Sequence, residues 1–571
     1  MPEIVTRQPD PDALKRLVAS GIDARLARLF AARGVADAAE VSSGLPGLIP
    51  PTALTHADAA ARLLADAIAA GKRILIVADY DADGATACAV GIRALRALGA
   101  RVDYIVPDRF KFGYGLTPEI VRVAAERQPD LLVTVDNGIA AVEGVAEANR
   151  LGIAVLVTDH HLPGDQRPDA ACIVNPNQPG CGFPSKSLAG VGVIFYVMLA
   201  LRAELRTRGA FAARKEPNLA ELLDIVALGT VADVVRLDAN NRILVAQGLE
   251  RIRAGRACAG ITALLEAAGR EARRASVSDL GFAVGPRINA AGRLEDMTVG
   301  IECLITDDEE RAAELAGKLD KLNRERRGIE ADMQESALQM LEGLDAGEDW
   351  SLTVHHPDWH PGVVGLLASR LKDRLNRPVF AFAAEPDGRL KGSGRSIAGL
   401  HLRDAIDLVS KRHPGMVERF GGHAAAAGLT LSAGQLEPFS HAFESVVREW
   451  LDPAALERRI ETDGELTDPE ITFDFAQALR SVVWGQGFPE PRFTGRFAVQ
   501  GSRVVGEKHA RLTLGSGSRR LNAIRFGEAG PFPARIEAVY RLDVNEYLGN
   551  STLQLVVEHW SPAASSPGEE A

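Results

Sequence analysis

Residues 72–84 read KRILIVADYDADG, and this stretch decides the fold. Its first half is a short apolar run that ends in aspartate, and helix-forming sequence follows from Ala85. Further apolar runs, separated by helical stretches, follow downstream. The runs are 102–107, 131–136 (LLVTVD) and 153–159 (IAVLVTD), and the helical stretches cover 118–127 and 140–150. Buried strands that alternate with helices predict an α/β fold with a mostly parallel sheet.

Three of these runs end in aspartate, at Asp79, Asp136 and Asp159. In an open parallel sheet, ligand sites lie beyond the carboxyl ends of the strands, and neighbouring strands are about 4.8 Å apart. We therefore expect the three carboxylates within one small volume. Further side chains of metal-ligand type follow these runs or could reach the same place, namely Asp81, Asp83, His160, His161 and Asp233.

Carboxylates crowded in this way repel one another and are costly to desolvate, unless cations neutralise them. Mixed oxygen and imidazole ligands suit Mn²⁺ or Mg²⁺ better than a thiolate-bound metal. Two such ions about 3.5–4 Å apart form a device that hydrolyses phosphate esters. The pattern therefore predicts a two-metal phosphoesterase centre.

Each aspartate taken alone has a simpler interpretation. An Asp after a strand is often the N-cap of the next helix, and Asp83 before Gly84 could be only that. A calcium loop is a weaker rival for DYDADG, because an EF-hand needs a preceding helix and a Glu several residues on. The joint occurrence of DxDxDG, DNG and DHH, each after an apolar run, favours the metal centre.

These segments resemble the motifs of a known family. VADYDADGATA, VTVDNGI, VTDHHLPG with VNPN, and ALGTVADVV are similar to motifs one to four of the DHH phosphoesterases. With PDRFKFGYG, GPRINAAGR, WHPGVVGLLASRL, GSGRS and GGHAAAAG, the chain resembles the bacterial single-strand-specific exonucleases of the DHH/DHHA1 superfamily over residues 45–560. The resemblance implies two divalent ions, Mn²⁺ or Mg²⁺, held by Asp79, Asp81, Asp83, Asp136, His160 and Asp233. Whether Asp79 or Asp81 binds directly stays open.

The resemblance also implies catalytic roles. Asp136 would bridge the ions, His161 would donate a hydrogen bond or a proton at the scissile phosphate, and Asp159 would orient an imidazole. A second, smaller α/β domain, DHHA1, would close over the cleft and hold the strand. The implied substrate-binding residues are Arg109, Arg287, Asn289, Arg293, Ser393, Arg395 and His423. Their basic and polar groups suit phosphodiester contacts, but each one alone could serve in a structural salt bridge, and GSGRS could be a flexible turn.

From Ile471 the sequence turns to an alternating β pattern, which is typical of a small barrel or sandwich. This part resembles an OB-type barrel. Basic residues interleaved with aromatics are what a single-strand platform needs, although aromatics such as Phe493 and Phe497 could instead form the barrel core. The platform candidates are Arg503, Lys508, Arg511, Arg519, Arg520 and Phe526.

The expected division of the chain combines these patterns with the resemblance. It consists of an N-terminal helical segment (1–50), the DHH domain (51–300), a long connector helix (301–345), DHHA1 (346–452), the OB-like domain (453–562) and a disordered tail (563–571). For the charges of the connector, a solvated surface helix is an equal alternative.

Composition limits the classes of protein. The 571 residues carry a formal charge of −11, which excludes a wholly basic nucleic-acid coat protein but not a local basic path. The five scattered cysteines include no CxxC, which favours a reducing compartment. We find no signal peptide and no apolar run long enough to span a membrane, so we expect a cytoplasmic protein without a membrane partner.

The resemblance implies a 5′→3′ exonuclease that hydrolyses single-stranded DNA to 5′-mononucleotides in recombination and repair. A single-strand-binding protein and a helicase are partners by analogy. One alternative is a DHH phosphoesterase for small substrates, such as oligoribonucleotides, cyclic dinucleotides or pyrophosphate. The other is a non-catalytic replication scaffold. The additional β-rich domain argues against the first, and the intact Asp and His set argues against the second.

Overall fold

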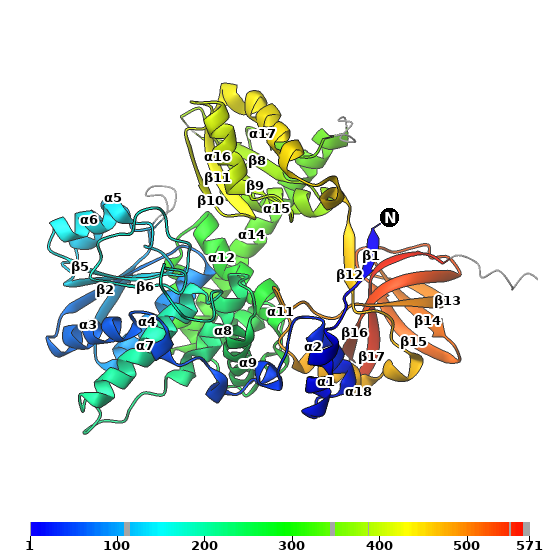
Figure 1. The fold of residues 1–571 in the computed structure, drawn as a ribbon, viewed down its shortest axis with the longest axis horizontal. Helices are drawn as coiled ribbons and strands as arrows, with labels where there is room; N and C mark the ends of the chain where they lie inside the picture. The colour runs from blue at the N-terminus through cyan, green and yellow to red at the C-terminus, as the bar shows by residue number, and fades with distance from the viewer. Residues whose placement is uncertain are drawn as a thin grey trace, which may run out of the picture.

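The computed structural model describes residues 2–107, 115–342, 349–385, 387–506, 508–547 and 550–563. Figure 1 shows a first α/β unit with a helical extension, a second α/β unit above it, and a β-barrel beside them. Residue 109, and residues 564–571 of the tail expected to be disordered (563–571), lie outside the described residues.

The first α/β unit is built on a parallel five-stranded sheet in the order β3-β2-β4-β5-β6. The strands are β2 (Arg73–Ala78), β3 (Arg101–Ile105), β4 (Leu131–Val135), β5 (Ala154–Thr158) and β6 (Cys172–Val174). The helices are α3 (Ala57–Ala69), α4 (Ala82–Leu98), α5 (Pro118–Ala125), α6 (Val142–Arg150) and α7 (Gly190–Thr207). The predicted parallel sheet is confirmed.

Alternating side chains on β2 bury both faces of this sheet. Ile74 and Ile76 join the core formed with α3, α4 and α7, whereas Leu75 and Val77 join the core formed with α5 and α6. Strand order reverses beside β2, since the chain moves outward to β3 and then crosses to β4. In doubly wound sheets such a switch point opens a crevice at the carboxyl ends of the strands.

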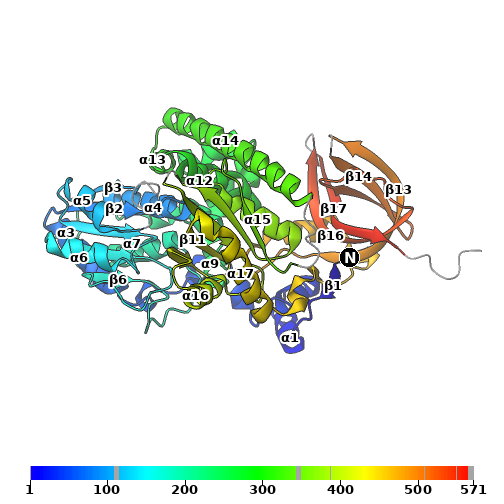
Figure 2. The same cartoon turned by 90° about the horizontal axis from the view of Figure 1, so that it is seen from above.

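A helical extension follows the sheet. It contains α8 (Leu223–Ala232), α9 (Ala239–Arg253), α10 (Ala259–Ala267), α11 (Val277–Asp279), the π-helical turn η6 (Leu280–Val284), α12 (Gly285–Leu294) and α13 (Thr298–Ile305). The connector is α14 (Glu309–Glu342), a single 34-residue helix. Figure 2 shows it running alongside the second α/β unit. Its early turns bury Ala312 and Leu319 in the first core, and Met333 and Ala337 pack in a core of the second unit.

The second α/β unit has a mixed sheet in the order β10-β11-β9-β8-β7, in which only β7 and β8 pair in parallel. Its strands are β7 (Leu352–His355), β8 (Val379–Ala384), β9 (Arg389–Arg395), β10 (Arg419–Gly422) and β11 (Ala426–Ser432). Its helices are α15 (Val364–Leu375), α16 (Leu402–Arg412) and α17 (Leu436–Trp450).

The C-terminal part is a closed barrel in the order β13-β14-β15-β17-β16, as the alternating pattern predicted. Its elements are α18 (Phe473–Ser481), β13 (Phe493–Val505), β14 (His509–Ser516), β15 (Arg519–Arg525), β16 (Arg535–Tyr547) and β17 (Asn550–Pro562).

The N-terminal segment is only partly helical. It contains α1 (Pro11–Ala19) and α2 (Ala24–Ala31), but it begins with strand β1 (Glu3–Thr6). This strand pairs in parallel with β12 (Arg459–Thr462), which precedes the barrel. This strand could not be predicted from local sequence, because its four residues are stabilised by a partner more than 450 positions away.

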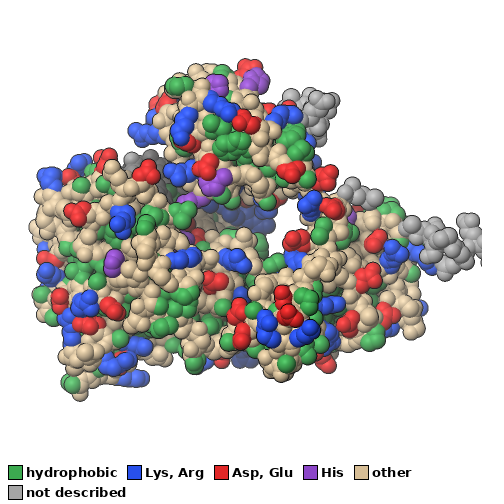
Figure 3. Space-filling view, in the orientation of Figure 1, with side chains coloured by type: hydrophobic (Ala, Val, Ile, Leu, Met, Phe, Trp, Pro, Cys, Tyr) green, Lys and Arg blue, Asp and Glu red, His purple; other side chains and the backbone are tan. Residues whose placement is uncertain are grey.

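Figure 3 shows a hollow between the two α/β units, with Lys and Arg side chains on its inner wall. Beside it an opening passes through the molecule, and β12 and β1 lie on the barrel side of that opening. Within the described ranges, every helix falls short of the length and apolarity that a bilayer crossing requires.

Candidate metal centre and cleft

The three aspartates that end the apolar runs lie in register at the carboxyl edge of the first sheet. Ala78 pairs with Val135, and Val135 pairs with Thr158. The next residue of each strand is the aspartate, so Asp79, Asp136 and Asp159 follow one another along this edge. The switch point predicted by the topology therefore coincides with the carboxylates.

The side chains around His160 form the centre of the cluster. Its Nε2 atom lies 3.1 Å from Oδ1 of Asp136, 3.5 Å from Oδ2 of Asp233 and 3.9 Å from Oδ2 of Asp83. Sets of potential ligand atoms lie within 4.8 Å of one another in Asp136, His160 and His161, in Asp83, His160 and Asp233, and in Asp79, Asp81 and Asp136.

Two of the motif-one aspartates also cap helices. Asp81 is the N-cap of α4 and accepts a hydrogen bond from the amide of Gly84 at 3.0 Å. Asp83 accepts hydrogen bonds from the amides of Gly190 (2.6 Å) and Val191 (2.8 Å) at the start of α7. An aspartate that caps a helix can also bind a metal ion, because each carboxylate oxygen can accept more than one interaction. The two interpretations are therefore compatible.

Asp159 is occupied by the backbone and by one imidazole. Its Oδ1 accepts the amides of His160 and His161 and lies 2.8 Å from Nδ1 of His161, and its Oδ2 accepts the amide of Ile139. Burial opposes ionisation, yet the His161 bond and the backbone bonds hold the pKa of Asp159 below its usual value. Burial alone would lower the pKa of His161, but Asp159 raises it to about 9. Asp159 thus fixes the ring and leaves its Nε2 side for the cleft.

The rest of the cluster is electrostatically unfavourable by itself. Burial, followed by repulsion between neighbouring carboxylates, raises the pKa of Asp79, Asp136 and Asp233 well above the usual value. The same causes raise the pKa of Asp83 to about 7, and burial lowers the pKa of His160 to about 4. A neutral imidazole among carboxylates is a donor set for divalent cations.

An imidazole nitrogen and a carboxylate oxygen of this set have no hydrogen bond within the described part of the chain. Nε2 of His160 and Oδ2 of Asp233 are both buried from solvent without one. Buried polar atoms normally have a partner, and these two lie 3.5 Å apart and face the same point. The residues present therefore fit divalent ions.

The second α/β unit supplies the opposite wall of the cleft. Ser393 and Arg395 lie on β9, and the Arg395 guanidinium donates to Ser393 Oγ at 3.0 Å. Gly365, in the first turn of α15, makes room for both, since a Cβ there would lie 2.9 Å from each side chain. A guanidinium and a hydroxyl at a helix N-terminus are suited to a phosphate group. Gly365 is the last residue of the motif WHPGVVG, and a glycine at the start of a helix was the sequence signal that could have indicated its role.

The two walls meet at a pair of histidines. The rings of His161 and His423 are stacked with centroids 5.9 Å apart. Burial and the neighbouring His161 lower the pKa of His423. The structure therefore brings His423, from the loop between β10 and β11, to the edge of the metal cluster.

The α12 residues face the cleft region but have structural contacts. Arg287 donates to Asp320 at 2.8–3.0 Å and to the carbonyl of Ala283 at 2.7 Å. The Oδ1 atom of Asn289 accepts the amide of Ala82 at 2.9 Å and so holds the motif-one loop. These contacts favour structural roles for both side chains in the absence of substrate.

Arg293 links the two walls of the cleft. Its guanidinium donates to the carbonyl of Gly362 in the second unit at 3.2 Å. Arg109, the remaining predicted substrate contact, falls in 108–114, outside the described residues.

Most of the predicted platform side chains point outward from the barrel. Arg503 and Arg511 are direct cross-strand partners on β13 and β14. Arg503, Lys508 and Arg520 are exposed, as is Phe526 at 53%. Two arginines opposite each other are unfavourable unless an anion relieves them, which suits a phosphate backbone.

The remaining barrel candidates have internal contacts. Arg519 donates to the carbonyls of Asp468 and Ile471. Phe493 and Phe497 are buried in the barrel core, as the alternative interpretation expected. These three side chains stabilise the barrel.

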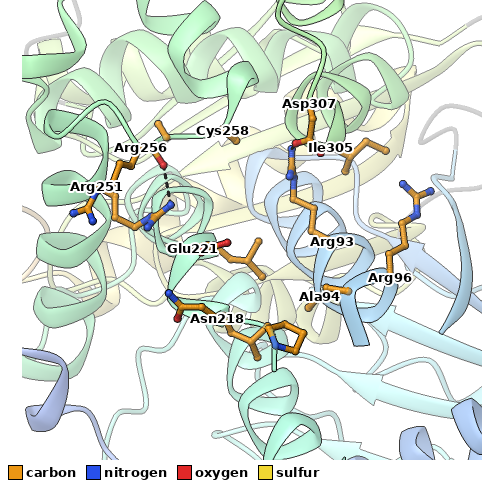
Figure 4. A pocket seen from close by; sticks show the side chains of 15 residues that line it. Arg93, Ala94, Arg96, Asn218, Glu221, Arg251, Arg256, Cys258, Ile305 and Asp307 are labelled. Atoms are coloured by element: carbon orange, nitrogen blue, oxygen red, sulfur yellow. Dashed lines mark hydrogen bonds and ion pairs between the residues drawn. The ribbon is translucent and has the colours of Figure 1, made fainter. Parts of the chain in front are cut away.

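A separate cavity of about 440 Å³ lies at the far end of α4 from the cluster (Figure 4). Two of its arginines have structural contacts. Arg93 donates to the carbonyls of Leu304 and Thr306, and Arg251 donates to the carbonyl of Arg256, a bond that Figure 4 marks with a dashed line. This cavity is not part of the cleft.

Comparison with known proteins gives the same division. The DHH family N-terminal domain matches residues 73–230, the DHHA1 domain matches 349–449 and the RecJ OB domain matches 462–559. A single-stranded-DNA-specific exonuclease RecJ from Dickeya dadantii is 52% identical over 95% of this chain and 96% of its own. The Escherichia coli protein of the same name is 50% identical over 94% and 96%.

The chain belongs to the RecJ family. The crystal structure of Thermus thermophilus RecJ in complex with Mn²⁺ is 29% identical and superposes with a TM-score of 0.82, covering 99% of this chain and 80% of that one. A second RecJ structure, bound to manganese, is 35% identical with a TM-score of 0.59 and covers 70% and 96%. The RecJ fold therefore extends over all the units described above.

Proposed function

We propose that this protein is a metal-dependent exonuclease that degrades single-stranded DNA from the 5′ end, releases 5′-mononucleotides and acts in recombination and repair. The observation that carries the proposal is the cluster around His160, whose carboxylates meet at the sheet edge opposite a phosphate-type pocket. Relatives at 50–52% identity are named for this activity.

The metal ligands in this proposal form two neighbouring sets. Asp79, Asp81 and Asp136 would hold one divalent ion, and Asp83, His160 and Asp233 would hold the other, with Asp136 between them. RecJ structures described with Mn²⁺ and with Mg²⁺ support these metals. A pair of such ions, when bound, activates water and stabilises charge on a phosphodiester.

His161 would act on the scissile phosphate, with Asp159 as its positioning residue. Nδ1–H of His161 donates to Asp159 Oδ1 at 2.8 Å, and a pKa raised to about 9 by Asp159 keeps the ring protonated, so Nε2–H is a second donor on the cleft side. There it can hydrogen-bond a phosphate oxygen or transfer a proton to the leaving group. The stacked His423 restricts the ring from the other wall.

The 5′ phosphate would bind at Ser393 and Arg395, beside the first turn of α15. Burial lowers the pKa of Arg395, and a bound phosphate would stabilise the charged guanidinium and offset this effect. Arg109, Arg287, Asn289 and Arg293 complete the proposed contacts. For Arg287, binding DNA would require exchange of its bond to Asp320.

The barrel would hold the strand before it reaches the cleft. Arg503, Lys508, Arg511, Arg520 and Phe526 form the proposed platform, and Arg519 would support it from inside through its bonds to the carbonyls of Asp468 and Ile471. Such a platform favours a polymeric substrate and argues against the small substrates of other DHH phosphoesterases. The expected boundary between 300 and 301 falls inside α13, so we propose that the first domain is 51–308 and that α14 (Glu309–Glu342) is the main part of the expected connector 301–345. The other two domains keep their expected bounds, 346–452 and 453–562.

Protein partners and compartment follow from the substrate. An enzyme that degrades single strands needs duplex opened by a helicase and works beside a single-strand-binding protein. The described cysteines are all free thiols, which supports the reducing cytoplasm as its compartment.

The test is digestion of 5′-labelled and 3′-labelled single strands and of blunt duplex, with Mn²⁺, Mg²⁺ or a chelator. We expect mononucleotides from the 5′ label at once, late loss of the 3′ label, intact duplex and no reaction in chelator. Release from the 3′ end first, or full activity in chelator, would overturn the proposal.

A further inference from the structure

The most exposed large apolar side chains of the described residues lie around the metal cluster. Phe282 is 84% exposed, and Leu162 and Val234 are each 62% exposed. Leu162 directly follows His161, and Val234 directly follows Asp233. Scattered apolar side chains on a surface are ordinary, but a group that borders one site marks a binding surface.

The turn that carries Phe282 packs through its glycines against the end of α8, the helix that leads to Asp233. A Cβ on Gly281 would lie 3.2 Å from Val231, and a Cβ on Gly285 would lie 3.0 Å from the Cβ of Ala232. The π-helical turn therefore packs on the last residues of α8. π-Helical turns are rare and are frequently found at functional sites.

This turn buries its other large side chains and presents one ring to solvent. Leu280 and Val284 are fully buried, whereas Phe282 points outward. Figure 1 shows the preceding α11 on the side of the first unit that faces the barrel. The turn that presents Phe282 directly follows α11, so it begins on this side of the first unit.

Val234 adds backbone strain at the same place. Its φ is +62°, a left-handed conformation that is a genuine outlier for a β-branched residue. Strain of this kind persists at functional sites where the surroundings enforce it. Here it turns an apolar side chain to solvent one residue after a proposed metal ligand.

We propose that Phe282 is a substrate-binding residue that stacks on a base of the substrate strand, with Val234 packed beside the same nucleotide. The inference rests on the proposed function and goes beyond it by assigning a base contact near the cleavage site. When the phosphates of a DNA strand lie at the metal cluster, its bases project away from the cluster, where an aromatic ring can stack on one of them. Every base has a π-face, so this contact is independent of the DNA sequence.

The first experiment measures stacking without hydrolysis. The Asp136→Asn protein is mixed with oligothymidylates that carry one 2-aminopurine at successive positions, and fluorescence quenching is recorded. We expect strong quenching at one or two adjacent positions, its loss in Phe282→Ala and its retention in Phe282→Trp. Identical profiles with and without Phe282 overturn the inference, whatever the enzyme's activity.

The second experiment uses the active protein and 5′-phosphorylated oligomers of increasing length. For oligomers long enough to reach the ring, Phe282→Ala should raise KM about 5- to 100-fold with kcat retained. Phe282→Leu should restore only part of the loss, because it keeps bulk without a ring. Trp450→Ala, on the outer end of α17 and 41% exposed, is the control and should leave KM unchanged. A wild-type KM for Phe282→Ala at every length overturns the inference, and an active wild type shows that the proposed function still stands.

Discussion

Asp136 combines a left-handed backbone with a buried carboxylate. Its φ is +62°, a region that Asp and Asn enter more readily than other residues with a side chain. Gly190 lies against it, and a Cβ there would be only 2.6 Å from Asp136 Oδ1. The start of α7 and the end of β4 can therefore approach closely, which places this carboxylate between the two proposed ion sites.

The substitution Asp136→Asn keeps the shape and removes the charge. We expect Mn²⁺-dependent hydrolysis to fall more than about 100-fold, since even outer partners of metal ligands cost 10- to 100-fold. In chelator, the same variant should be more stable by about 0.5–2 kcal/mol, because it relieves repulsion at an active site. The measurements are turnover with Mn²⁺ and thermal unfolding in chelator. Binding of single-stranded DNA should stay unchanged. Asp58→Asn, at an exposed position of α3, is the control, and a less stable metal-free Asp136→Asn would contradict the argument.

Individual contacts of the site could be predicted only where the chain is locally regular. Asp79, Asp136 and Asp159 end neighbouring parallel strands, so their convergence follows from sequence and sheet geometry. The capping of α7 by Asp83 did not follow, because Gly190 lies 107 positions away. Likewise, nothing local indicated that Asp320 would occupy the guanidinium of Arg287.

At the scale of elements, the barrel strands followed from their alternation, but the direction of each basic side chain required the fold. The register pairs Arg503 with Arg511, whereas Arg519 turns to internal carbonyls. Strand β1 and the π-helical turn before α12 were not predicted, since both depend on distant packing.

The pair on β13 and β14 can be tested by salt dependence. Changing Arg503 and Arg511 together to Ala should weaken single-strand binding and lower the slope of log affinity against log salt by about 1–2. Hydrolysis of the shortest oligomers should be retained. Binding titrations at several salt concentrations measure the effect. Arg496→Ala, on the same strand but facing Glu537, should leave the slope unchanged, and an equal change in both variants would count against the platform.

At the scale of the whole molecule, a buried ion pair ties the N-terminal segment to the barrel. Arg33 and Asp463 pair through both oxygens at 2.8 and 2.9 Å, with their side chains 1% and 2% exposed. Asp463 also accepts the amide of Arg492 at the start of the barrel. Removing one partner leaves an uncompensated buried charge.

Asp463→Ala should therefore lower the free energy of unfolding by about 3–5 kcal/mol. Urea unfolding followed by tryptophan fluorescence is suitable, because the Arg33 guanidinium lies 5.1 Å from the Trp484 ring. Glu461→Ala removes the neighbouring pair with Arg7, in which Glu461 is 61% exposed, and should cost about 0–1 kcal/mol. Equal losses in the two variants would refute the assignment.

The pairing of β1 with β12 has a topological consequence. It joins residues 3–6 to residues 459–462 across one side of the opening seen in Figure 3. A single strand of DNA can enter this opening only by a free end. It cannot leave sideways while β1 and β12 stay paired. Circular single-stranded DNA, which has no free end, could not enter the opening. A linear strand, once threaded, would stay linked to the enzyme through successive rounds of cleavage.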